Sequence, residues 1–170
     1  MKKVLFLLGH LKDLDIEWMI HNGIKKKLNN QDELISKGKT VDNIYIVLSG
    51  NLAITNGNQS IASVGPGEIV GEMSFIESRP PSVSVSASEP SEVYCISKEL
   101  MDKKLNSDIE FKSNFYYSLA LFLSNRLRQT TSKLGYGAPE EEDLIDTNVL
   151  DGISQAGSRF SQILHKFSEV

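Results

Sequence analysis

The pattern of hydrophobic and polar positions divides the chain into a helical beginning, a β-rich middle and a helical end. Over residues 1–30, apolar side chains recur at helical spacing, which predicts an N-terminal helical segment. Over residues 31–97, short apolar segments alternate with turn sequences such as Asn56 followed by Gly57, which is typical of a hairpin. Residues 82–87 alternate strictly between polar and apolar types, as a half-buried strand does. We therefore expect a mainly β fold with flanking α-helices, a jelly-roll-like β-roll (double-stranded β-helix).

The region after the β-roll is predicted to be helical. Residues 98–135 contain a short helix capped by Ser97 and then a long helix from about residue 108 to residue 134. The long helix carries an apolar stripe wider than packing on the roll alone requires, so we expect a homodimer through this helix. The stripe consists of Phe115, Leu119, Phe122, Leu123 and Leu127.

Two further segments complete the predicted organisation. Residues 136–147 are rich in carboxylates and are interpreted as an acidic linker. Residues 148–170 are predicted to form a C-terminal amphipathic helix, which either packs back on the dimer or docks a protein partner. Only 33 residues follow Gly137, enough for this linker and helix. We therefore expect neither a winged helix-turn-helix nor a nucleic acid partner.

Composition and charge narrow the function classes. The net charge of −4 argues against a general nucleic-acid binder, which usually presents a basic face. No apolar run approaches the length of a membrane-spanning helix, and the lone Cys95 cannot form an internal disulfide. We therefore expect a cytoplasmic protein without a membrane partner.

Candidate catalytic and metal-binding groups give no positive signal. The three histidines, His10, His21 and His165, show no repeated ligand spacing, so we expect no metal site. No Ser-His-Asp or Cys-His set can be assembled, and Cys95 lies in an apolar segment typical of a buried strand. The sequence thus predicts neither an enzyme nor a bound cofactor.

The most informative segment is Gly67–Phe75 together with Arg79–Val85. With Gly38, Gly50 and the flanking helices, it resembles the cyclic-nucleotide-binding domain family, over roughly residues 5–134. That family includes catabolite activator proteins and the regulatory subunits of cyclic-AMP-dependent kinases. The resemblance implies a regulatory domain in which a ligand, cyclic AMP or cyclic GMP, biases the position of the long helix and thereby the dimer or the C-terminal segment.

The resemblance also implies a ligand-binding set. The matching glutamate of the family accepts a hydrogen bond from the ribose 2′-hydroxyl, and Ser82 stands where a small or hydroxyl residue contacts the phosphate. We expect Gly71 to allow close backbone approach, and the free amides of residues 73–75 to face the phosphate. Thr130 and Thr131 stand where the family places purine contacts, although polar residues are also common near helix ends. The candidate residues are Gly71, Glu72, Met73, Ser74, Arg79, Ser82, Val83, Thr130 and Thr131.

One position departs from the family pattern. Members that bind cyclic nucleotides usually carry an arginine immediately before the residue matching Ser82, and here that residue is Pro81. Loss of one charge-assisted hydrogen bond weakens binding on the order of 10- to 100-fold. Arg79 either substitutes for the missing arginine or is a surface loop residue. The sequence therefore leaves two functions open: a ligand sensor, or a degenerate β-roll that serves as a protein-interaction or assembly module.

Overall fold

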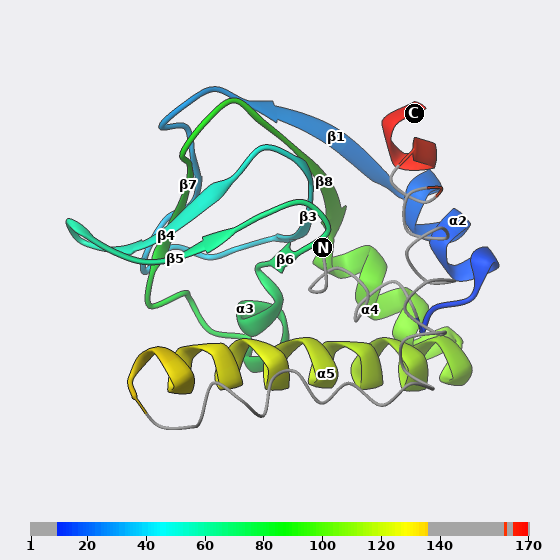
Figure 1. The fold of residues 1–170 in the computed structure, drawn as a ribbon. Helices are drawn as coiled ribbons and strands as arrows, with labels where there is room; N and C mark the ends of the chain where they lie inside the picture. Colours follow the sequence, from blue (N-terminus) through cyan, green and yellow to red (C-terminus); the bar gives the residue numbers. More distant parts are fainter. Residues whose placement is uncertain (1–9, 136–161, 163–164, 170) are drawn as a thin grey trace.

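Two facing four-stranded antiparallel sheets form the centre of the computed structural model, which describes residues 10–135, 162 and 165–169 (Figure 1). The first sheet consists, in spatial order, of β1 (Gly23–Leu28), β8 (Ser91–Ser97), β3 (Asn43–Ser49) and β6 (Ile69–Val70). The second consists of β2 (Glu33–Ile35), β7 (Ser84–Ala87), β4 (Leu52–Asn56) and β5 (Gln59–Val64). The predicted β-roll is confirmed, and the turn after Asn56 joins β4 to β5 with Gly57 at a φ of +60°.

Strands β3 and β8 are buried on both faces and separate two hydrophobic layers. On one face, Ile44 and Ile46 of β3 and Tyr94 of β8 pack against the helices. On the other face, Val47 and Val93 point into the interior of the roll, between the two sheets. Successive side chains of a strand point to opposite faces, so one strand serves both layers. The helices therefore lie on one side of the roll, away from the second sheet.

Four α-helices accompany the roll in the described part of the chain. They are α2 (Asp13–His21), α3 (Glu72–Glu77), α4 (Lys98–Ser107) and α5 (Ile109–Lys133). The Ser97 hydroxyl accepts a hydrogen bond from the Leu100 amide, and the Asp108 carboxylate accepts one of 2.9 Å from the Phe111 amide, so both helices begin at capping residues. Helix α5 runs beneath α3 and α4 (Figure 1) and ends before Gly135, whose φ is +82°. The predicted short and long helices are confirmed.

The prediction that residues 1–30 are helical is wrong at its C-terminal end. Helix α2 stops at His21, and residues 23–28 form β1, which pairs with β8 from Gly23 opposite Ile96 to Leu28 opposite Ser91. Three consecutive lysines mask the strand in the sequence because their polarity hides any period-2 pattern. A Cβ on Gly23 would lie 2.8 Å from the Cys95 carbonyl oxygen and would clash with the Tyr94 ring, so the close approach of this strand to β8 requires glycine here.

Other predictions fall wholly or partly outside the described residues. Residues 1–9, the acidic linker 136–147 and most of the predicted helix 148–170 belong to this group. Residues 165–169 are described and helical, and the Phe167 ring is fully buried with its centroid 4.7 Å from that of Tyr94. Figure 1 shows this C-terminal turn beside α2. In the described part of the chain, no helix combines the length and apolarity needed to cross a membrane.

Candidate functional site

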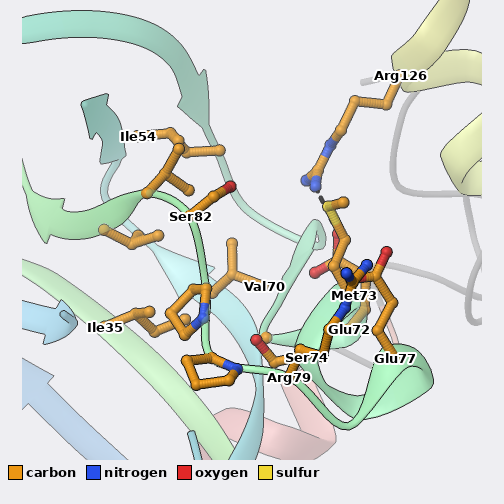
Figure 2. Close-up of a pocket in the computed structure, with 15 residues that line it drawn as sticks. Ile35, Ile54, Val70, Glu72, Met73, Ser74, Glu77, Arg79, Ser82 and Arg126 are labelled. Carbon is orange, nitrogen blue, oxygen red and sulfur yellow. Dashed lines mark hydrogen bonds and ion pairs between the residues drawn. The ribbon is translucent and has the colours of Figure 1, made fainter. Parts of the chain in front are cut away.

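A cavity of about 460 Å³ opens between α3, the loop that leads into β7, and α5. Seven of the nine predicted ligand-binding residues line it. They are Gly71, Glu72, Met73, Ser74, Arg79, Ser82 and Val83. Figure 2 shows Ser82 on the wall opposite α3, and Arg126 reaching in from the side of α5. The segment identified from the sequence therefore contributes to two opposite walls of one cavity.

Gly71 sets the start of α3. Its φ of +86° lies in the left-handed region, and a Cβ there would lie 2.8 Å from the Asn43 carbonyl oxygen. The close approach that requires glycine is thus to β3 of the same chain. The Gly71 carbonyl accepts a hydrogen bond of 3.1 Å from the Phe75 amide. The expectation that the Phe75 amide is free to face a ligand is therefore wrong.

Glu72 is bound to the long helix. Its carboxylate oxygen Oε1 lies 2.7 Å from Nη1 of Arg126, and Nη2 of the same guanidinium donates a 3.1 Å hydrogen bond to the Ile69 carbonyl. The Glu72 side chain is 3% exposed and that of Arg126 is 26% exposed. The guanidinium carbon also lies 4.4 Å from the centre of the Phe122 ring. The acidic residue of the cavity is therefore joined to α5 by a charge-assisted hydrogen bond.

Burial and charge act on Glu72 in opposite directions. Burial disfavours the ionised carboxylate and raises the pKa of Glu72 above its ordinary value. The positive charge of Arg126 and the backbone amides of Glu72 and Met73 lower this pKa, without cancelling the effect of burial. Arg126 is thus the main group that stabilises the ionised form of the buried Glu72 carboxylate.

The loop before β7 carries the departure from the family pattern. The Pro81 carbonyl accepts a 2.8 Å hydrogen bond from the Gly38 amide, which holds the loop against the turn before β3. Proline has no backbone N–H and no charge, so this position of the cavity wall offers a ligand no donor. Arg79 also lines the cavity, and its Nη2 is 2.8 Å from Oε2 of Glu77 at the end of α3.

The structure does not bring the two predicted threonines into the cavity. The Thr130 hydroxyl donates to the Arg126 carbonyl, and the Thr131 hydroxyl donates to the Leu127 carbonyl, each within α5. Neither residue lines the cavity. Within one copy of the chain, these threonines behave as polar helix residues that bond to the preceding turn.

The sequence reasoning missed Arg126. A signal was available, since residue 126 continues the helical spacing of the buried residues Phe115, Leu119 and Phe122. A charged residue on a buried stripe needs a partner, which here is Glu72. The reasoning also missed Glu77 and the apolar walls, which come from separate strands of the roll. The apolar wall residues include Ile35, Ile54, Val70 and Val85.

Other candidate chemistry is weak. Cys95 lies in β8 and is buried, as expected, and burial raises the pKa of its thiol, which disfavours the nucleophilic thiolate. Within the ranges that the structure describes, no three His, Cys, Asp or Glu side chains form a group suited to a metal ion.

Replacing Arg126 with glutamine tests the buried ion pair. We expect Arg126→Gln to lower the free energy of unfolding at pH 7 by about 3 kcal/mol, because Glu72 is left as a buried charge without its counter-ion. Since the Glu72 pKa is raised in the fold and rises further without Arg126, the loss should grow as pH increases above the ordinary pKa of a glutamate and shrink as pH falls toward it, because a protonated carboxyl needs no counter-ion. Urea unfolding at several pH values measures both effects.

The matched controls are Arg128→Gln and the double substitution Glu72→Gln with Arg126→Gln. Arg128 is an exposed neighbour on α5, so its replacement should change stability little at any pH. The double variant should recover most of the lost stability. An Arg126→Gln variant as stable as the wild type at pH 7 would contradict a role for the pair in stability.

Comparison with known proteins agrees with this geometry. Residues 25–108 match the sequence profile of a family described as cyclic nucleotide-binding domain. A cAMP-dependent protein kinase regulatory subunit from Yarrowia lipolytica is 24% identical over 111 residues, which cover 65% of this chain. The match covers only 30% of the length of that relative.

Solved structures share the fold. A cyclic nucleotide-binding domain from Methylobacillus flagellatus superposes with a TM-score of 0.70 at 22% identity and covers 85% of this chain and 86% of its own. The catabolite activator protein of Thermus thermophilus gives a TM-score of 0.63 at 20% identity, and the match covers 96% of this chain and 87% of that protein's chain. The regulatory domain of Toxoplasma gondii PKA, solved with cAMP, gives a TM-score of 0.54 at 23% identity, and the match covers 60% of this chain and 41% of that chain. The chain belongs to the cyclic nucleotide-binding domain family.

Proposed function

We propose that this regulatory domain senses a cyclic nucleotide, cyclic AMP or cyclic GMP, and passes occupancy of the cavity to helix α5. The domain acts by binding and not by catalysis, and the relative from Yarrowia lipolytica is likewise described as a regulatory subunit. The observation that carries the proposal is the Glu72–Arg126 pair, because it joins the candidate ligand-binding residue directly to the long helix. The proposal requires neither a cofactor nor a DNA-binding element.

The cavity offers polar groups suited to a nucleotide. Glu72, once a ligand is present, accepts a hydrogen bond from a ribose hydroxyl while Arg126 continues to neutralise its charge. Ser82 donates from the opposite wall, and the amides of Met73 and Ser74 lie at the first turn of α3. The aliphatic side chains of Ile54 and Val85 provide an apolar surface for a base or sugar face.

A second contact supports transmission to the helices. Phe75 of α3 packs edge-to-face on Phe115 of α5, and Phe115 stacks on Phe111, which contacts Trp18 of α2. A ligand that binds more tightly to one position of α3 therefore biases the positions of α5 and α2 as well. We propose that this shift, and not a new chemical step, is the output of the domain.

Titration with cyclic AMP and cyclic GMP tests the sensor directly. We expect saturable binding by calorimetry, together with slower hydrogen exchange in α5 around residues 122–133, because bound ligand stabilises one position of that helix. The same titration of Glu72→Gln should show weaker binding, since an amide is a poorer acceptor than a carboxylate. Absence of saturable binding at millimolar concentrations of both nucleotides would contradict the sensor function.

The charges of the cavity also support a second function. Residue 81 is a proline and both lining arginines are paired with glutamates, so none of the described lining residues offers an unpaired cation to a phosphate. Under this alternative, the β-roll is a degenerate scaffold that no longer binds nucleotide and acts in assembly. The C-terminal segment was expected either to pack back on the protein or to dock a partner. For residues 165–169, the burial of Phe167 in the core of the same chain favours packing back.

Replacing Pro81 with arginine separates the two functions. If the scaffold is degenerate, Pro81→Arg should create cyclic nucleotide binding that the wild type lacks. If the domain is a sensor, the wild type already binds, and the new arginine should tighten binding on the order of 10-fold or more. Parallel calorimetry of both proteins, with a urea unfolding curve for each, gives the answer.

The exposed face of α5 supports the proposed homodimer. Three apolar side chains on this face are exposed: Tyr116 at 40%, Leu127 at 67% and Leu134 at 70%. In chain order, the residues Tyr116, Ala120, Leu123, Leu127 and Leu134 are separated by four, three, four and seven positions. Such spacing places the side chains on one seam, as in a two-stranded coiled coil. Tyr116, Leu127 and Leu134 lie outside the buried stripe formed by Phe115, Leu119 and Phe122, whereas Leu123 also packs against that stripe.

Replacing Leu127 with serine tests the homodimer. We expect the wild type to sediment as a dimer and Leu127→Ser to shift the equilibrium toward monomer, because the substitution removes an apolar side chain from the centre of the seam. The control is Arg128→Ser, an exposed neighbour on α5 outside the seam. Analytical ultracentrifugation over a concentration series measures the effect. A wild type that remains monomeric at high concentration, or a dimer insensitive to Leu127→Ser, would show that this seam is not the interface.

A further inference from the structure

The charges that line the cavity are balanced before any ligand enters. Among the described lining residues, two are cationic, Arg79 and Arg126, and two are anionic, Glu72 and Glu77. Arg79 forms an ion pair with Glu77, and Arg126 forms one with Glu72. Because Pro81 provides no donor, an anionic group in this cavity gains a cationic partner only by taking one arginine away from its present carboxylate.

Arg126 is the costlier of the two to recruit. Its carboxylate partner Glu72 is 3% exposed, so removal of the guanidinium leaves a buried charge without a counter-ion. Arg126 would also lose its hydrogen bond to the Ile69 carbonyl and its contact with the Phe122 ring. These contacts favour an Arg126 that remains with Glu72 when the cavity is filled.

Arg79 is the easier arginine to recruit. Its side chain is 72% exposed and that of Glu77 is 41% exposed, so either group can be hydrated when the pair separates. Exposed ion pairs of this kind contribute little to stability. The two residues come together because Ser78, between them, has a φ of +53° and turns the chain at the end of α3. Exchange of Glu77 for another anion therefore replaces one exposed pair with another.

We propose that Arg79 is the residue that recognises the anionic group of the ligand, in competition with Glu77. The proposal deepens the sensor function and rests on it, because it concerns the cyclic phosphate of a nucleotide in the same cavity. Arg79 and Ser82 stand on either side of the two prolines in the chain, and both line the cavity. Arg79 lies beside Glu77 at the end of α3 and Ser82 lies on the opposite wall, so they approach the phosphate from two sides (Figure 2). Glu77 acts as a built-in competitor that weakens binding of anions and leaves neutral ligands unaffected.

The test compares charged and neutral probes on variants of the pair. Cyclic AMP and adenosine are titrated by calorimetry into the wild type, Arg79→Gln and Glu77→Gln. We expect Arg79→Gln to weaken cyclic AMP binding by about 10-fold and Glu77→Gln to tighten it by about 3-fold, with adenosine changed less than about 2-fold in both. The contribution of Arg79 should also decrease with added salt, since the pair is exposed.

A second exposed pair supplies the matched control. Lys103 and Glu99 on α4 are 2.6 Å apart, and their side chains are also largely exposed, but neither lines the cavity. Lys103→Gln and Glu99→Gln change the net charge of the protein in the same way as the two test variants. They should leave the ratio of cyclic AMP affinity to adenosine affinity unchanged, which separates a local contact from a general effect of charge.

The outcomes are distinct from those of the sensor test. If the wild type shows no saturable binding of either cyclic nucleotide, the sensor function fails, and this proposal fails with it. If the wild type binds but neither Arg79→Gln nor Glu77→Gln alters the preference for cyclic AMP over adenosine, the proposal is overturned and the sensor function stands. If the preference is lost in Arg126→Lys and retained in Arg79→Gln, Arg126 is the anion-binding residue, and the proposal is likewise overturned.

Discussion

The carboxylate of Glu72 is buried at the first residue of α3, and the guanidinium of Arg126 reaches it from α5, more than fifty positions later in the chain. Burial makes the charge of Glu72 unfavourable, and Arg126 compensates it. This requirement holds the first turn of α3, on one wall of the cavity, close to the long helix. The arrangement of the site therefore depends on one pair of charges that must stay together in the folded protein.

The hydrophobic layers explain why α5 can take this position. Strands β3 and β8 are buried on both faces, so the roll has its own interior and still presents an apolar face to the helices. Phe75 and Phe115 join α3 to α5 within the helical layer. The cavity lies at the edge where both layers end, which gives it apolar walls from the roll and a charged wall from the helices.

Pro81 adds no charge to the cavity, whose charged lining residues are two arginines and two glutamates. Its carbonyl is held by Gly38, so the loop keeps its place against the roll although the side chain carries no charge. The two arginines that remain are both paired, one in a buried and one in an exposed setting. The two pairs differ strongly in exposure, and our proposal that Arg79 is the exchangeable partner of a ligand rests on this contrast and not on the number of charges.

The sequence by itself determined the β-roll and the two helices after it, because turns, caps and apolar spacing act over a few residues and are visible locally. The glycine-glutamate segment was found through its resemblance to a known family. Sequence reasoning failed where a contact joins distant segments. Strand β1 was hidden by its lysines, since pairing with β8 decides its conformation. The partner of Glu72 was also hidden, because only the packing of α5 on α3 brings Arg126 to it. The pairing of Arg79 with Glu77, two residues away, was hidden for a different reason: the chain turns at Ser78 in a left-handed conformation, which is uncommon for a residue other than glycine, so only the three-dimensional structure reveals it.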